Sequence, residues 1–146
     1  MAVSPGAYAL TFEKMFIDTA AQSMEAETHK EALVTDTYAP DFDVHDFFDD
    51  ITNEITGTNY VTGGVACTGT EWTIAGGLMT FDMVDTVYSN VTIATVMGGV
   101  FYFNVGSAAT DQLLLLQDFV TGASATAADF TIQHHTNGVL TLDHTP

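Results

Sequence analysis

The spacing of hydrophobic residues changes once along the chain, near residue 30. From Tyr8 to Ile17 the apolar residues recur at helical intervals, and Ser4-Pro5 just before them is typical of a helix start. This pattern predicts one short amphipathic helix within residues 7–20. The polar stretch that follows predicts a loop, and the segment Glu31-Ala32-Leu33-Val34-Thr35 predicts a first buried strand.

Beyond residue 30 the pattern has a period of two. Short runs in which apolar and polar residues alternate are separated by glycine pairs or Asn-Gly, and threonine, valine, isoleucine and aromatic residues dominate the composition. Both features are typical of antiparallel strands joined by tight turns. We therefore expect a mainly β fold: a single antiparallel β-sandwich or barrel of about seven or eight strands, with one short N-terminal helix. The β domain is expected to span residues 30–142, with a core that includes Trp72, Phe81, Ile93, Phe101, Phe130, Ile132 and Leu140.

Three segments near the ends of the chain carry more specific expectations. Asn137-Gly138 is the strongest hairpin signal, and it predicts a C-terminal hairpin between residues 130–134 and 139–142 whose two central residues, Asn137 and Gly138, take positive φ. The small and polar residues from Thr121 to Asp129 predict an exposed loop. Residues 1–6 are expected to form an N-terminal arm that becomes ordered on assembly.

The charge of the chain is strongly one-sided. Its 146 residues include 19 acidic residues against two cations, Lys14 and Lys30, which gives a formal net charge of −17. Because a phosphate contact needs a positive donor, this balance argues against nucleic acid, anionic membrane and phosphorylated substrates as partners. A hydrophobic fraction of 47% nevertheless supports a sizeable core, as expected for one domain spanning residues 1–146.

We expect no membrane-spanning helix and no cleavable signal. The longest apolar stretch, residues 91–105, is interrupted by polar residues and by Gly98-Gly99, which predicts a turn between two separate strands. Residues 1–5 contain neither the basic region nor the apolar region of a signal peptide.

The densest cluster of polar side chains lies between Asp41 and Asp50. Its oxygen-rich composition suits a hard cation such as Ca²⁺. The spacing differs from the twelve-residue calcium loop, because no glycine occupies the sixth position and Thr52 stands at the twelfth. We favour a structural interpretation, in which Pro40 opens a turn and one helical turn follows, with phenylalanines packed inward and carboxylates facing water. The candidate ligands, should a metal bind, are Asp41, Asp43, His45, Asp46 and Asp50.

The remaining reactive residues have simpler interpretations, and we expect no catalytic residue and no cofactor. Cys67 is expected to be a buried small hydrophobe, because the chain has few groups that could activate a thiolate. His134 and His135 are adjacent, so on a strand they point to opposite faces and cannot chelate one ion together. Leu113 to Leu116 predict a strand buried on both faces, either in the core or at a subunit interface. The interface candidates are therefore Leu113, Leu114, Leu115 and Leu116.

Several segments taken together resemble a family of small bacteriophage virion proteins that are encoded among head and tail structural genes. The resemblance covers most of the chain after residue 28 and carries no catalytic signature. The matching stretches are Leu33–Asp41, His45–Tyr60, Gly63-Gly64, Thr95, Tyr102, Gly106–Thr110, Phe130–Ile132 and Asn137–Leu140.

The resemblance implies a structural component of a phage particle. The first expectation is a capsid decoration (cement) protein that stabilises the head by binding the major capsid protein, and a tail or head–tail component is the alternative. Such a protein assembles in the host cytoplasm, resides in the virion, and acts as a homo-oligomer. The resemblance to decoration proteins at icosahedral threefold positions implies a trimer. Its partners are other virion proteins, not nucleic acid or membrane. From the residues alone, a metal- or glycan-binding β module is the rival class, and an enzyme comes third.

Overall fold

Strands dominate the chain, which the computed structural model describes over residues 6–17, residue 24 and residues 28–143. The described strands form two antiparallel sheets, with the orders β1-β7-β6-β2-β3 and β4-β5-β8. This arrangement confirms the predicted mainly β, sandwich-like fold, with one short α-helix among the described residues. The elements are β1 (Gly6–Ala7), α1 (Ala9–Ile17), β2 (His29–Val34), the 3-10 helix η1 (Phe48–Asp50), β3 (Val65–Ala66), β4 (Glu71–Ala75), β5 (Leu78–Asp82), β6 (Thr86–Phe103), β7 (Leu113–Ile132) and β8 (Leu140–Asp143).

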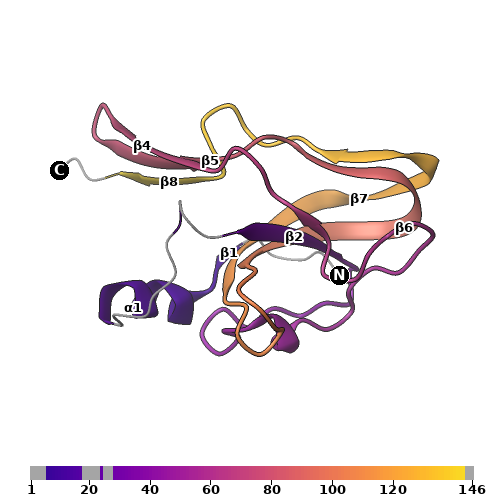
Figure 1. Ribbon diagram of the computed structural model, residues 1–146, viewed down its shortest axis with the longest axis horizontal. Coiled ribbons are helices and arrows are strands. Elements are labelled where there is room, and N and C mark those ends of the chain that lie inside the picture. Colours follow the sequence, from indigo (N-terminus) through magenta and orange to yellow (C-terminus); the bar gives the residue numbers. More distant parts are fainter. Residues whose placement is uncertain (1–5, 18–23, 25–27, 144–146) are drawn as a thin grey trace.

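Two long strands, β6 and β7, connect both layers of the fold. They contain 18 and 20 residues and pair with each other over almost their whole length. Halfway along, the paired ribbon curves round, so that one half lies over the other (Figure 1). One half pairs with β1 and β2, and the other half leads into β5 and β8. A single bent ribbon therefore contributes to both layers.

Four β-bulges accompany the bending of this ribbon. The pairing register between β6 and β7 shifts at each of the four, and each contains a non-glycine residue whose φ is positive, between 46° and 58°. A further shift, between Phe101 and Tyr102, contains no such residue. A bulge adds one residue to one strand, bends it and increases its twist. At each of these four bulges a side-chain oxygen accepts the backbone N–H of the positive-φ residue: Asn90 donates to Asp129, Thr95 to Ser124, Val120 to Asp118 and Ala127 to Thr92. The bends are therefore stabilised by the side chains of Thr92, Asp118, Ser124 and Asp129.

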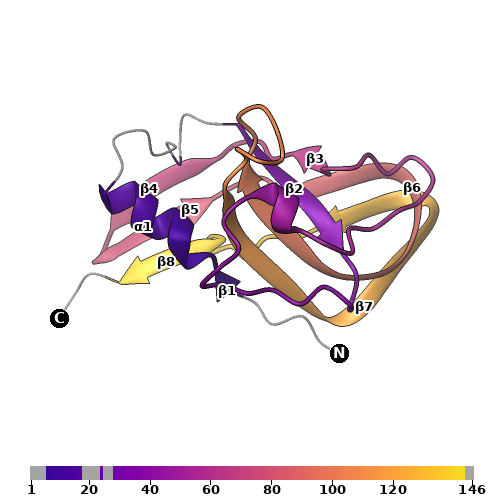
Figure 2. The same cartoon turned by 90° about the horizontal axis from the view of Figure 1, so that it is seen from below.

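The five-stranded sheet is covered on both faces, which explains the uninterrupted apolar runs in β6 and β7. One face packs against the N-terminal segment and the loop between β2 and β3 (Figure 2), through Tyr8, Ala32, Val34, Tyr38, Val100, Tyr102, Leu113 and Leu116. The opposite layer packs through two further clusters that include Leu33, Phe81, Ile93, Phe101, Phe103 and Leu114. Of the expected core, Phe81, Ile93, Phe101 and Ile132 are buried, whereas Trp72, Phe130 and Leu140 are partly buried against it.

The predicted C-terminal hairpin is wrong in its pairing, and its turn is only partly as predicted. The chain turns at His135–Gly138 with Thr136 and Asn137 at the centre, and Asn137 does not take the positive φ that was predicted for it. Gly138 has a φ of +92°, and its N–H donates to the carbonyl of His135 at 2.8 Å. The two flanking segments nevertheless belong to different sheets, because Phe130 pairs with Tyr88 on β6 and Leu140 pairs with Phe81 on β5. The turn therefore connects the two layers instead of closing a hairpin.

Two other predicted turns or loops lie inside strands. Gly98-Gly99 is part of β6, and a Cβ at Gly99 would collide with the carboxylate of Glu31. Glycine is needed there for close packing, not for a turn. The segment from Thr121 to Asp129 belongs to β7 and is mostly exposed, so the prediction of exposure holds while that of a loop is wrong.

The N-terminal expectations fall partly outside the described residues. The helix predicted within residues 7–20 is α1, Ala9–Ile17, and residues 18–20 lie outside the described part. Of the predicted arm, residues 1–5 also lie outside it, whereas Gly6 pairs with Leu116 in β1. No α-helix in the described part of the chain has the length and apolar character needed to cross a membrane.

Candidate functional site

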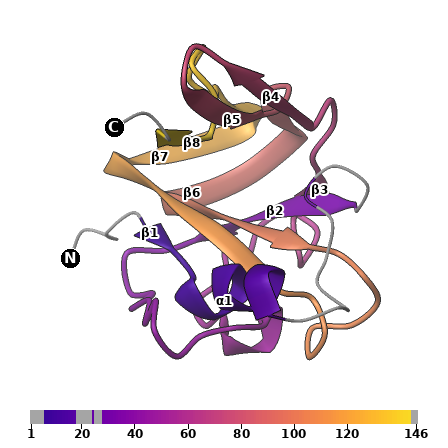
Figure 3. The ribbon, with the colours of Figure 1, turned by 90° about the vertical axis from the view of Figure 1, so that its left-hand side faces the viewer.

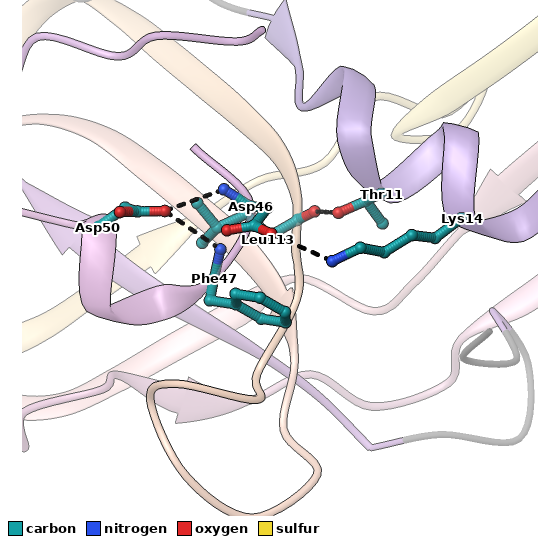
Figure 4. Close-up of polar contacts among 6 residues, drawn as sticks. All are labelled: Thr11, Lys14, Asp46, Phe47, Asp50 and Leu113. Atoms are coloured by element: carbon teal, nitrogen blue, oxygen red, sulfur yellow. Dashed lines mark hydrogen bonds and ion pairs between the residues drawn. The ribbon is translucent and has the colours of Figure 1, made fainter. Parts of the chain in front are cut away.

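The acidic segment 41–50 forms a turn and then η1, close to helix α1 (Figure 4). The Asp46 carboxylate forms an ion pair with the Lys14 ammonium at 3.1 Å, and the same ammonium lies 4.1 Å from the centre of the Phe47 ring. One carboxylate oxygen of Asp50 accepts hydrogen bonds from the N–H groups of Asp46 and Phe47, at 3.0 and 3.4 Å. The backbone of Asp46 is tied to β7 through the N–H of Leu113. These carboxylates hold the segment against its neighbours.

The other candidate metal ligands of this segment also have local partners. The Asp41 carboxylate accepts the N–H of Asp43 at 3.1 Å, and Nδ1 of His45 lies 3.2 Å from the hydroxyl of Tyr38. Asp43 takes part in these contacts only through its backbone N–H. Among the residues that the structure describes, no group of three or more His, Cys, Asp or Glu side chains is arranged to hold a metal ion.

The two adjacent histidines have different surroundings. His134 is half-buried, with Nε2 3.1 Å from the hydroxyl of Thr86, and burial lowers the pKa of its imidazole. His135 is exposed, and its Nδ1 accepts the N–H of Asn137. Cys67 packs against an interior cluster, and burial raises the pKa of its thiol, which disfavours the reactive thiolate.

A fully buried carboxylic acid, Glu31, lies on β2 between the layers. None of its surface is exposed, and neither carboxylate oxygen has a hydrogen bond of normal geometry. Burial raises the pKa of Glu31 to about 8, and the hydroxyl of Thr86 lowers it only in part. Glu31 is therefore mainly uncharged at neutral pH.

The surroundings of Glu31 fix its position tightly. The Tyr88 hydroxyl donates to the backbone carbonyl of Glu31 at 2.5 Å, and Gly99 leaves the space that its carboxylate occupies. Ionised Glu31 would raise the pKa of the neighbouring Cys67 thiol and of the Tyr88 phenol. Because the carboxyl group of Glu31 is enclosed, its ionisation makes the free energy of unfolding depend on pH.

The four leucines named as interface candidates are covered by the chain itself. Their exposed fractions lie between 0% and 7%. Leu113 and Leu116 belong to the cluster on one face of the five-stranded sheet, and Leu114 and Leu115 belong to the cluster on the other. Leu113 and Leu114 are therefore core residues. Leu115 and Leu116 are also buried, and in addition they line the groove described next.

A groove of about 830 Å³ follows β7 where that strand bends back on itself. Figure 3 shows β7 between β1 and β8 on this side of the molecule. The polar lining is uncharged apart from Asp118 and the titratable His135, and it contains no lysine. The apolar lining consists of Leu115, Leu116, Phe119, Phe130, Ile132, Val139 and Leu140 together with small residues of β1.

The outer edge of β7, on the side away from β6, borders this groove. Among the described residues, only Gly6 and Ala7 pair with that edge, opposite Leu116 and Leu115. A strand edge without a neighbour presents backbone N–H and C=O groups that can pair with another chain. Within the described part of the chain, the groove thus combines an apolar floor with backbone groups of β7 that no neighbouring strand pairs.

Val120, at the bend of β7, is the most unusual residue beside the groove. Its side chain is 80% exposed and its φ is +53°. Positive φ is strained for a β-branched residue, and glycine or asparagine would adopt it at lower cost. Val120 therefore exposes an apolar side chain to solvent, and its backbone has a conformation that is unfavourable for valine.

Sequence reasoning did not identify Glu31 or the groove. A signal for Glu31 was available, because the alternation of β2 places it on the same face as Leu33, which faces the interior. The groove had no local signal, since its walls come together only when β7 bends.

Comparisons of the chain with protein-family models, with curated proteins and with solved structures find no match.

Proposed function

We propose that this chain is a structural protein of a bacteriophage particle, specifically a capsid decoration protein that stabilises the head by binding the major capsid protein. One observation carries the docking role: the apolar groove along β7, bordered by a strand edge that the described residues leave largely unpaired. The virion class is supported by the sequence resemblance over segments such as His45–Tyr60.

The charge of the chain supports docking onto a positively charged surface. With a net charge of −17, the chain repels other acidic surfaces and attracts basic ones. Lys14, one of the two cations, is already paired with Asp46. The partner surface therefore supplies the positive charge.

The surroundings of the reactive side chains support a role without catalysis. The pKa of the Cys67 thiol is raised and that of the His134 imidazole is lowered, and the carboxylates of Asp46 and Asp50 stabilise the local fold. Decoration proteins at threefold positions of a capsid are trimers, so a homotrimer seated on the capsid remains part of the proposal. A tail or head–tail location is the alternative within the same class.

The proposal is tested on purified particles of the phage that encodes the chain. Mass spectrometry of the particles should detect the chain at a fixed ratio to the major capsid protein. Particles from a deletion strain should be less resistant to heating, and added purified protein should restore that resistance. Absence of the chain from purified particles contradicts the virion class, and presence in isolated tails alone contradicts the decoration role.

A further inference from the structure

We infer that the groove along β7 binds an extended segment of a partner protein, rich in alternating basic and apolar residues, which adds to the outer edge of β7 as a strand. This inference rests on the proposed docking function and specifies the chemistry of the partner.

The edge of β7 has the geometry that strand addition requires. β1 pairs only with Leu115 and Leu116, and beyond them the edge continues along the groove to Thr121 and Ala123. An added strand would gain main-chain hydrogen bonds, and every second side chain would point towards the apolar floor. The bend at Val120 limits the regular part of this edge to a short segment, which suits a short extended peptide.

The charge of the chain selects a basic segment over a second copy. Two copies that met through this edge would bring their Asp118 carboxylates together, and no lysine lines the groove to pair with them. A partner with lysine or arginine on its outward-facing positions is attracted to the chain, while its apolar positions fill the floor.

Val120 provides a separate reason to place a partner at this bend. Val120 lies between two residues that line the groove, Phe119 and Thr121, and a partner that covers the bend would bury its exposed apolar side chain. Asparagine at this position would relieve the strain and remove the apolar contact. We therefore expect Val120→Asn to raise the melting temperature and at the same time to weaken partner binding.

The test uses the full chain and a fluorescent peptide of about eight residues in which lysine and valine alternate. The control peptide has proline in place of each valine, so it keeps the charge but loses the backbone N–H donor at every second residue and cannot form a regular added strand. Fluorescence anisotropy should show saturable binding of the first peptide, and binding about tenfold weaker for the second. Amide exchange measured by NMR should show new protection at residues 117–123.

Protein variants show whether the groove is the binding site. Thr121→Arg places bulk and positive charge in the groove, and Thr73→Arg makes the same change on the exposed polar face of β4. Thr121→Arg should weaken binding of the Lys-Val peptide about tenfold relative to Thr73→Arg, with similar melting temperatures. Equal binding by the two variants, equal binding of the two peptides, or no saturable binding would each overturn the inference.

Two further outcomes identify other occupants. Concentration-dependent self-association that Thr121→Arg abolishes would assign the groove to a second copy. Binding that appears only in a variant lacking residues 1–5 would assign it to the N-terminal segment of the chain itself. Either result contradicts the inference. If peptide binding fails while the chain is present in capsids, the inference is wrong and the docking function stands, whereas binding by a chain absent from virions contradicts only the proposed function.

Discussion

Glutamine in place of Glu31 keeps the shape of the side chain but cannot ionise. In the wild type, burial raises the pKa of this carboxyl group from 4.5 to about 8. The folded state therefore holds the proton more tightly than the unfolded state does. The stability contributed by the protonated form is fully present below pH 4.5 and is lost progressively as the pH rises to about 8. Glu31→Gln cannot ionise, so its unfolding free energy does not contain this pH-dependent loss.

The size of the effect follows from the two pKa values. A shift of one pKa unit corresponds to about 1.4 kcal/mol, so Glu31 alone lowers the unfolding free energy of the wild type by about 3 kcal/mol between pH 4.5 and pH 7. The difference in unfolding free energy between Glu31→Gln and wild type should change by about 1.4 kcal/mol per pH unit in this range, in favour of the variant. The buried amide has a cost of its own that is independent of pH, so the slope is the diagnostic quantity.

Urea unfolding at a series of pH values between about 5 and 8.5 measures this slope. Glu71→Gln is the matched control, because Glu71 is an exposed strand residue on β4. Its difference from wild type should change little over the same range. A Glu31→Gln difference that stays constant with pH would refute the argument that Glu31 is buried and uncharged.

Three further predictions concern the bulges, the core and the acidic segment. Thr92→Val removes the acceptor of the Ala127 N–H and should lower the unfolding free energy by about 1 kcal/mol in chemical denaturation, whereas Thr126→Val, at an exposed position in the same strand region, should have a smaller effect. Phe101→Ala empties a fully buried position and should cost about 3–5 kcal/mol, and a loss below about 1 kcal/mol would contradict the assigned core. Calorimetric titration with Ca²⁺ should give no stoichiometric micromolar isotherm, while a monovalent salt should stabilise the protein by screening its charge. A micromolar isotherm that is lost in Asp43→Asn and Asp46→Asn would overturn the structural interpretation of residues 41–50.

The mainly β class of the fold and its short helix could be predicted from local patterns, but the pairing of the strands could not. Alternation and turn residues correctly indicated antiparallel strands and a short helix, because both depend on neighbours in sequence. A turn near Asn137-Gly138 was predicted, but its centre and the pairing of its flanks were not, because turn residues do not determine which sheet each flank joins. Val139 donates to Phe81, a long-range contact that no local pattern encodes.

The bent ribbon caused the other errors. Thr121-Gly122 has the composition of a turn, yet it lies within β7, next to the bulge at Val120. Bulges and turns use similar residues because both tolerate unusual φ values and side-chain hydrogen bonds to the backbone. The groove depends on this bend, so it was inaccessible to sequence reasoning for the same reason.

A three-dimensional reconstruction of the intact phage particle tests the proposed function most directly. It should show this chain as a trimer on the outer surface of the capsid, with the β7 groove of each copy facing the major capsid protein and an extended basic segment of that protein beside β7. A capsid without density for the chain, or a chain seated on the capsid through another face with its groove open to solvent, would contradict the account.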